Sequence, residues 1–292
     1  MISLLIFTGG IMTTYKYRPG RFYLITLAST WVLWFAAAFG SRRENGFVAA
    51  MVLMMLGLFV PTVTAFLFVR FSGSPVLRRD YKEKLCGYFR INPLNILGGL
   101  AVFTALIFAS IGISLLFGEP VSQFGFAGGF SFSIGGMPTL FVLLLTAVFE
   151  ELGWRGYAED SIAQYHSWFS ESIIFGFLWA AWHIPLFFIE GTYQANILEM
   201  SPLYMINFFA GMMPLGFFFT WIYVGNNRSI FACSIVHFAV NFLQEQINLT
   251  QNTKCIETVL LFFVAAAIVA LNRDMFFEKR HVGNIIPADK QP

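Results

Sequence analysis

The segment Pro138–Tyr157 reads PTLFVLLLTAVFEELGWRGY, and it decides the fold class of this chain. It is mostly apolar and matches the roughly 20 residues that a helix needs to cross the hydrocarbon core of a bilayer. Similar segments follow along the chain, with ends expected to be accurate to about 2–4 residues. They are Phe22–Phe39, Gly46–Val69, Ile96–Phe117, Ser172–Ile189, Pro202–Val224, Ser229–Leu249 and Ile256–Leu271. The sequence therefore predicts an all-α polytopic membrane protein with about eight transmembrane helices.

The composition supports the same fold class and excludes several functions. The chain is 57% hydrophobic and 12% charged, whereas soluble domains carry about 25% charged residues. A net charge of +2, without basic residues arranged along a recognition helix, argues against nucleic acid as a partner. Cys86, Cys233 and Cys255 are widely spaced, so neither a disulfide framework nor a thiolate metal cluster is indicated.

The loops predict how the chain is oriented. Arg70–Leu94 mixes basic and apolar residues and predicts an interfacial helix. Gly118–Gly136 is rich in Gly, Ser and Phe, which predicts a flexible loop or a re-entrant lid. Lysines and arginines concentrate on the side that holds both termini, so we expect a multi-pass protein of the cell membrane with both termini cytoplasmic. The chain starts at Met1 or at Met12, since the apolar run between them makes a poor signal peptide.

Ionisable residues inside membrane spans are costly and usually functional. Glu151 and Arg155 are four residues apart, so they share a helix face and are expected to pair. Glu150 points about 100° away from Glu151 and is directed at something else. His237 and Asn241 have the same spacing of four and begin a polar stripe on another helix.

Three of these helices place a polar residue at a similar depth. At a rise of about 1.5 Å per residue, we expect Glu150 about 10 Å, His183 about 16 Å and His237 about 12 Å from the inner ends of their helices. These depths lie in the cytoplasmic half of the membrane. The sequence therefore predicts that a carboxylate and two imidazoles meet there.

Such a group is suited to hydrolysis. Glu150 could take a proton from water, and His183 could orient that water or share the role of base. His237 and Asn241 could donate hydrogen bonds to a developing oxyanion. The alternative is a zinc site made of Glu150, His183 and His237 with a water as the fourth ligand, and spacing does not decide between the two.

Together the three polar segments resemble the motifs of the CPBP family of intramembrane proteases. The family includes the CAAX prenyl endopeptidases and bacteriocin-processing or immunity proteins, and its motifs are EExxxR, FxxxH and HxxxN. The matching positions are Glu150, Glu151 and Arg155, then His183, then His237 and Asn241. Trp179 stands where the second motif has Phe. The likeness covers roughly Pro138–Leu249. The sequence around the first motif, EELGWRGY, is similar to that of the prokaryotic branch.

The resemblance implies an eight-helix fold with a cavity open to the cytoplasm and to lipid. It implies that Glu150 and His183 activate water, that His237 and Asn241 stabilise the oxyanion, and that Glu151 and Arg155 support them. A metal-free mechanism is favoured, with zinc as the alternative. Residues 1–137 would hold N-terminal helices and the basic loop 70–94, residues 138–249 the catalytic core, and residues 250–292 the last helix and a cytoplasmic tail.

We therefore expect an intramembrane endopeptidase that cleaves a peptide bond near the cytoplasmic face. Its partners would be membrane lipid and a membrane-associated substrate, either a prenylated CAAX tail or a transmembrane or signal-like peptide. One alternative is a non-catalytic membrane scaffold or bacteriocin-immunity protein of the same fold. Another is a transporter, for which inverted repeats are expected and none is visible in the sequence.

Overall fold

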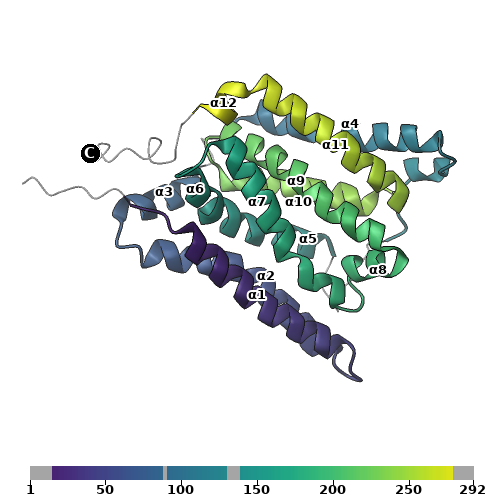
Figure 1. The fold of residues 1–292 in the computed structure, drawn as a ribbon, viewed down its shortest axis with the longest axis horizontal. Helices are drawn as coiled ribbons and strands as arrows, with labels where there is room; N and C mark the ends of the chain where they lie inside the picture. The colour runs from purple at the N-terminus through teal and green to yellow at the C-terminus, as the bar shows by residue number, and fades with distance from the viewer. Residues whose placement is uncertain (1–14, 88–90, 130–138, 279–292) are drawn as a thin grey trace, which may run out of the picture.

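A computed structural model describes residues 15–87, 91–129 and 139–278 (Figure 1). Over these residues the chain is a bundle of helices, which confirms the predicted all-α polytopic membrane fold. Six helices in the described ranges are long and apolar enough to cross a membrane, the fourth of them including a 3-10 turn that continues it. They are α1 (Pro19–Ser41), α2 (Phe47–Arg70), α4 (Pro93–Leu115), α7 (Trp168–Trp182) with η4 (Ile184–Phe188), α9 (Pro202–Gly225) and α11 (Gln251–Leu271).

The other two expected spans are shorter, so the count of eight is not confirmed. The described part of α5 (Thr139–Gly153) has 15 residues, and α10 (Ile230–Gln246) has 17. The chain of α5 continues without a break through a π-helical turn, η3 (Trp154–Ala158), into α6 (Glu159–Ala163). The polar first motif thus lies within a longer helical rod than the sequence predicts.

The outward faces of the bundle are apolar, as a lipid solvent requires. On α1, for example, the side chains of Leu24, Val32 and Phe39 are 70%, 71% and 64% exposed. On the same helix Trp34 is buried and its indole donates a hydrogen bond to the Met54 carbonyl of α2 at 2.9 Å. Figure 1 shows α1 and α2 along one flank, α4 and α11 along the other, and the helices that carry the motifs between them.

The helix expected in the basic loop is present as α3 (Pro75–Cys86). Its N-cap Ser74 accepts a hydrogen bond from the Leu77 amide, which starts the helix. One side of α3 is exposed, and the other buries Lys84, whose Nζ lies 2.5 Å from the Asp160 carboxylate of α6. Ion pairs therefore fix this amphipathic helix against the end of the bundle where α1 begins and α12 lies (Figure 1).

The loop expected at Gly118–Gly136 is described up to residue 129, and residues 130–138 lie outside the described ranges. Its first part holds a 3-10 turn, η2 (Val121–Phe124). The Gln123 side chain accepts a hydrogen bond from the Thr250 amide at 2.9 Å, and the Ala127 amide donates to the Gln246 carbonyl at 2.8 Å. The described part of this loop is therefore bonded to the link between α10 and α11.

Two short helices complete the described fold. α8 (Tyr193–Met200) follows η4 at the end of the bundle opposite α3 and α6 (Figure 1). The last helix, α12 (Arg273–Phe277), follows α11 after a single residue.

The expected depth of Glu150 and His183 is wrong, because their helices extend further than predicted. With α6 included, Glu150 lies about 20 Å from the inner end of its rod, and His183 lies about 22 Å beyond the start of α7 at Trp168. His183 is the C-cap of α7, and a 3-10 turn that contains Pro185 begins directly after it at Ile184. The polar residues thus lie near the middle of the bundle.

The buried ion pair between Asp160 and Arg228, whose closest atoms are 2.5 Å apart, gives a common reference height for measuring positions along α5 and α10. Glu150 lies about 15 Å and His237 about 13 Å beyond this pair along their helices. The predicted match in level between Glu150 and His237 therefore holds, although Glu150 lies further from the end of its helical rod than expected.

Candidate active site

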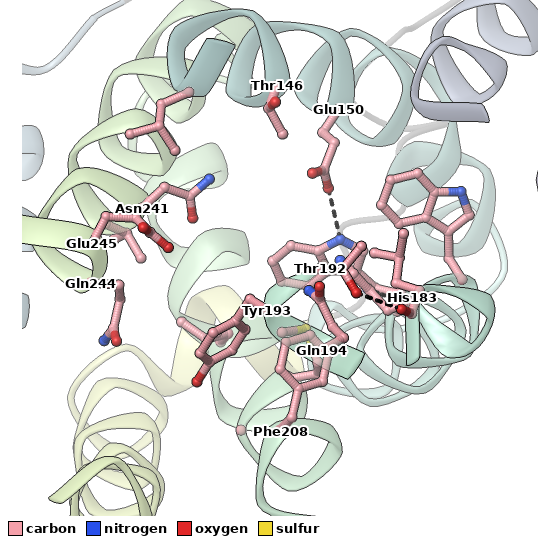
Figure 2. Close-up of a pocket in the computed structure, with 18 of the residues that line it drawn as sticks. Thr146, Glu150, His183, Thr192, Tyr193, Gln194, Phe208, Asn241, Gln244 and Glu245 are labelled. Carbon is pink, nitrogen blue, oxygen red and sulfur yellow. Dashed lines mark hydrogen bonds between the residues drawn. The ribbon is translucent and has the colours of Figure 1, made fainter. Parts of the chain in front are cut away.

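A cavity of about 440 Å³ lies among the helices that carry the three motifs. The four predicted catalytic side chains all line it: Glu150 from α5, His183 at the end of α7, and His237 and Asn241 from α10. Figure 2 shows Glu150, Asn241 and His183 around one open space, with Tyr193 of α8 across from Glu150. The structure thus brings together residues that the sequence places on three separate helices.

The Glu150 carboxylate is 4% exposed and is held by two tryptophans. Its Oε2 accepts a hydrogen bond from the indole Nε1 of Trp179 at 3.0 Å and from that of Trp154 at 3.3 Å. Donors of this kind stabilise a carboxylate that burial would otherwise disfavour. The substitution of Trp for Phe at position 179 therefore has a consequence that the sequence did not reveal, because only an indole can make this bond.

His183 is oriented by the backbone of its own helix. Its Nδ1 lies 2.7 Å from the Trp179 carbonyl oxygen. A carbonyl only accepts hydrogen bonds, so Nδ1 carries the proton, and Nε2 of the neutral ring keeps its lone pair. The rings of Trp182 and Phe208 pack edge-on against the imidazole at 4.8 and 5.4 Å. The ring that lines the cavity is therefore held by a backbone contact and by two aromatic neighbours.

His237 is held by the second residue of the first motif. Its Nδ1 lies 2.7 Å from Glu151 Oε1. Arg155 forms an ion pair with the same carboxylate, with Nη1 at 3.1 Å from Oε1 and Nε at 3.1 Å from Oε2. The predicted pair of Glu151 and Arg155 is confirmed. The pair also contacts His237, which lines the cavity, and the sequence analysis did not predict this contact.

Arg155 also binds a carboxylate that the sequence analysis missed. Its Nη2 lies 3.0 Å from Glu159 Oε1, and all three residues of this group are fully buried. The guanidinium is further packed against the rings of Phe175 and Phe219, at 4.9 and 5.1 Å from their centroids. The spacing of four between Arg155 and Glu159 was the signal that could have found this contact.

The π-helical turn after the motif is capped from outside. Lys84 of α3 donates to the carbonyls of Arg155 and Gly156 at 3.1 and 2.7 Å, and the Tyr223 hydroxyl donates to the Arg155 carbonyl at 2.9 Å. A π-turn leaves backbone groups without their usual partners and often occurs at functional sites. α3 and α9 thus stabilise the backbone that carries Arg155.

The zinc alternative is not supported by the grouping of the described side chains. Within residues 15–87, 91–129 and 139–278, no three His, Cys, Asp or Glu side chains are grouped as a metal would require. We therefore derive no step through a metal ion.

The walls of the cavity differ in chemistry from one side to the other. The side formed by α2 and α5 is apolar and carries Met51, Met54, Met55, Leu58, Val142 and Leu143. The polar side is formed by α8, the end of α10 and the start of α11, and it carries Tyr193, Gln244, Gln251, Lys254 and Glu257. This polar side lies toward α8, at the end of the bundle away from α3 and α6 (Figure 1).

Comparison with known proteins agrees with this site. A sequence model described as type II CAAX prenyl endopeptidase Rce1-like matches residues 133–243, which hold all three motifs. The CAAX prenyl protease 2 of Methanococcus maripaludis is 42% identical to this chain over 269 residues, which is 92% of the chain and 99% of that protein. This likeness supports intramembrane endopeptidase activity. The chain belongs to the CAAX prenyl protease family.

Proposed function

We propose that this protein hydrolyses a peptide bond near the C-terminus of a lipidated, CAAX-type peptide, with water activated by Glu150 and without a metal. The observation that carries the proposal is the single cavity lined by Glu150, His183, His237 and Asn241. Its apolar wall on α2 suits a lipid chain, and its polar wall suits a peptide. A transmembrane or signal-like peptide is the substrate in a host that does not prenylate proteins.

In the first step Glu150 accepts a proton from a water molecule. The two indole donors hold its carboxylate in place for this task. His183 orients the same water through Nε2, because its Nδ1 is bonded to the backbone. The water oxygen attacks the carbonyl carbon, and a C–O bond forms.

In the second step His237 and Asn241 stabilise the oxyanion. The Glu151 carboxylate accepts a hydrogen bond from Nδ1–H of His237 and offsets the positive charge of an imidazolium, which keeps both ring protons and presents Nε2–H to the cavity. Asn241 supplies an amide donor one helical turn away. The C–N bond then breaks, and Glu150 returns the proton to the leaving amine.

Glu151 and Arg155 act as positioning residues in this scheme. They do not touch the substrate, and they fix the ring of His237 by the chain of bonds described above. We assign catalysis to residues 138–249. The helices before and after this region contribute further walls of the cavity. Both termini are proposed to be cytoplasmic on the basis of the positive-inside rule. With that orientation the polar side of the cavity, toward α8, faces away from the cytoplasm, which departs from the expected opening to the cytoplasm.

The proposal is tested by cleavage of lipidated peptides with the purified full-length protein. Glu150→Gln and His183→Ala are each expected to lower kcat by about 10²–10⁴-fold, the usual contribution of an acid–base group. The matched control is Glu199→Gln, which changes an exposed carboxylate on α8 that does not line the cavity. Turnover that is unchanged in both cavity variants would refute the proposal. Cellular function that survives Glu150→Gln would favour a binding role instead.

A further inference from the structure

A second cavity, of about 350 Å³, lies between the start of α1 and the end of α2. It is separate from the candidate active site, since the two cavities share no lining residue among those described. Two of its lining residues are Arg18 and Arg21, and none of the described ones is acidic. Arg18 directly precedes α1 and Arg21 lies three residues later in its first turn, so both project from one side of that turn. The cavity therefore carries two positive charges at the end of the bundle where α1 begins.

These two charges are not neutralised by the part of the chain that the structure describes. The ion pairs formed among residues 15–87, 91–129 and 139–278 include neither guanidinium, and the first turn of α1 holds no acidic residue. A third cation lies close by, because the Arg70 guanidinium packs over the ring of the lining residue Phe71, 5.6 Å from its centroid. Cations that gather at a recess of one sign attract an anion.

The cavity becomes apolar toward the middle of the bundle. Ile25 lies about 6 Å further along α1 than Arg21, on the same helix face. Leu67 lies a similar distance before Phe71 on α2, which packs beside α1 and runs in the opposite direction (Figure 1). The side chains of Ile25 and Leu67 line the cavity and are 46% and 44% exposed. The recess therefore has charge at its outer end and open apolar surface about one helical turn deeper.

We propose that this cavity binds one anionic phospholipid, with its phosphate between the two arginines and a hydrocarbon chain along Ile25 and Leu67. Guanidinium groups suit a phosphate because they can donate two parallel hydrogen bonds to its oxygens. Basic pockets between transmembrane helices on the cytoplasmic side bind anionic headgroups. With both termini in the cytoplasm, as proposed above, the cavity faces the inner leaflet, whose surface is negative. Binding of this lipid does not require the proposed peptidase function.

The lipid site adjoins the helical rod that carries the first motif. The Tyr15 hydroxyl, which lines the cavity, is hydrogen-bonded to the Tyr157 hydroxyl of η3 at 2.9 Å. The Arg18 backbone amide donates to the same Tyr157 oxygen at 3.1 Å. A ligand that binds only the folded state raises the free energy of unfolding. The bound lipid is therefore expected to raise the thermal unfolding temperature of the protein.

The test measures the dissociation constant of the first bound phosphatidylglycerol by native mass spectrometry of the full-length protein in detergent. Phosphatidylcholine with the same acyl chains has no net charge and is expected to bind about 5–10-fold more weakly. Arg18→Gln combined with Arg21→Gln should weaken phosphatidylglycerol binding by about 10–100-fold, as expected for lost charge-assisted contacts. The same variant should lose the rise in unfolding temperature that phosphatidylglycerol gives the wild-type protein.

Two further variants sharpen the comparison. Arg78→Gln combined with Lys82→Gln is the matched control, because it removes the same charge from exposed positions of α3 outside both cavities. This control should keep the wild-type dissociation constants for both lipids. Leu67→Trp places a larger side chain in the apolar part of the cavity and should weaken the binding of both lipids.

Several results would overturn the lipid site. Equal affinity of the wild-type protein for the two lipids would show that no anion is selected. An equal loss of affinity in the α3 control would show a general attraction of the basic end of the bundle for anionic lipid. Inorganic phosphate that displaces phosphatidylglycerol at equal concentration would assign the arginines to free phosphate. If the arginine variant does not fold, Leu67→Trp decides, because wild-type affinity for phosphatidylglycerol in that variant would contradict binding in this cavity.

Discussion

The Trp179→Phe variant tests how the protein keeps Glu150 competent as a base. The Trp179 indole donates to Glu150 Oε2 at 3.0 Å and its ring stacks on Phe175 with centroids 5.6 Å apart. Phe keeps the stacked ring and the backbone carbonyl that orients His183, so the substitution removes one hydrogen-bond donor and little else. The Trp154 donor at 3.3 Å remains.

The size of the effect follows from that single bond. A hydrogen bond to a charged group contributes about 1.5–3 kcal/mol, and a tenfold change in rate corresponds to about 1.36 kcal/mol. In Trp179→Phe the carboxylate is held by the Trp154 indole alone. We therefore expect Trp179→Phe to lower kcat/KM by about 10–100-fold.

The assay measures kcat and KM for peptide cleavage by purified wild-type and variant proteins. Trp31→Phe is the matched control, because its indole lies outside the cavity and donates to the Ala181 carbonyl at 3.1 Å instead of to Glu150. The control should keep the wild-type kcat/KM. A wild-type kcat/KM in Trp179→Phe would refute the assigned role of the indole.

Other predictions concern the residues that position the site and the orientation of the protein in the membrane. Glu151→Gln should lower kcat by about 10–100-fold with KM nearly constant, because the charge-assisted bond to His237 is lost; a change in KM alone would argue against this. Arg228→Met should lower the free energy of unfolding by about 3–5 kcal/mol, since Asp160 loses a buried partner; unfolding at the wild-type denaturant midpoint would contradict this. Cys86, an exposed thiol on α3, should react with a membrane-impermeant reagent in inverted vesicles only, and labelling of intact cells would reverse the proposed orientation.

Much of the fold could be predicted because lipid imposes a simple rule. Long apolar runs must be helices in a bilayer, so the six long spans were found with ends off by a few residues. The amphipathic α3 was visible from its mixed composition. The ends of α5 and α7 were missed for a common reason. Glu159, Asp160 and Glu171 are charged and lie just outside the expected spans, yet each is fully buried within a helix.

The candidate site was predictable in its residues and less so in its contacts. Helical spacing alone indicated that Glu151 pairs with Arg155 and that His237 and Asn241 share a face, because these relations lie within one helix. The bond between Glu151 and His237 joins helices far apart in sequence, so spacing could not reveal it. The π-helical turn at Trp154–Ala158 was not predicted either, and the Lys84 side chain that donates to its Gly156 carbonyl comes from another helix.

The most direct test of the account is the activity of the purified protein after exhaustive chelation, measured together with its metal content. Glu150, His183, His237 and Asn241 are proposed to hydrolyse the peptide with side chains and water alone. The account predicts that kcat/KM is unchanged when bound metal falls far below one ion per protein chain. Loss of activity on chelation that zinc restores would contradict it.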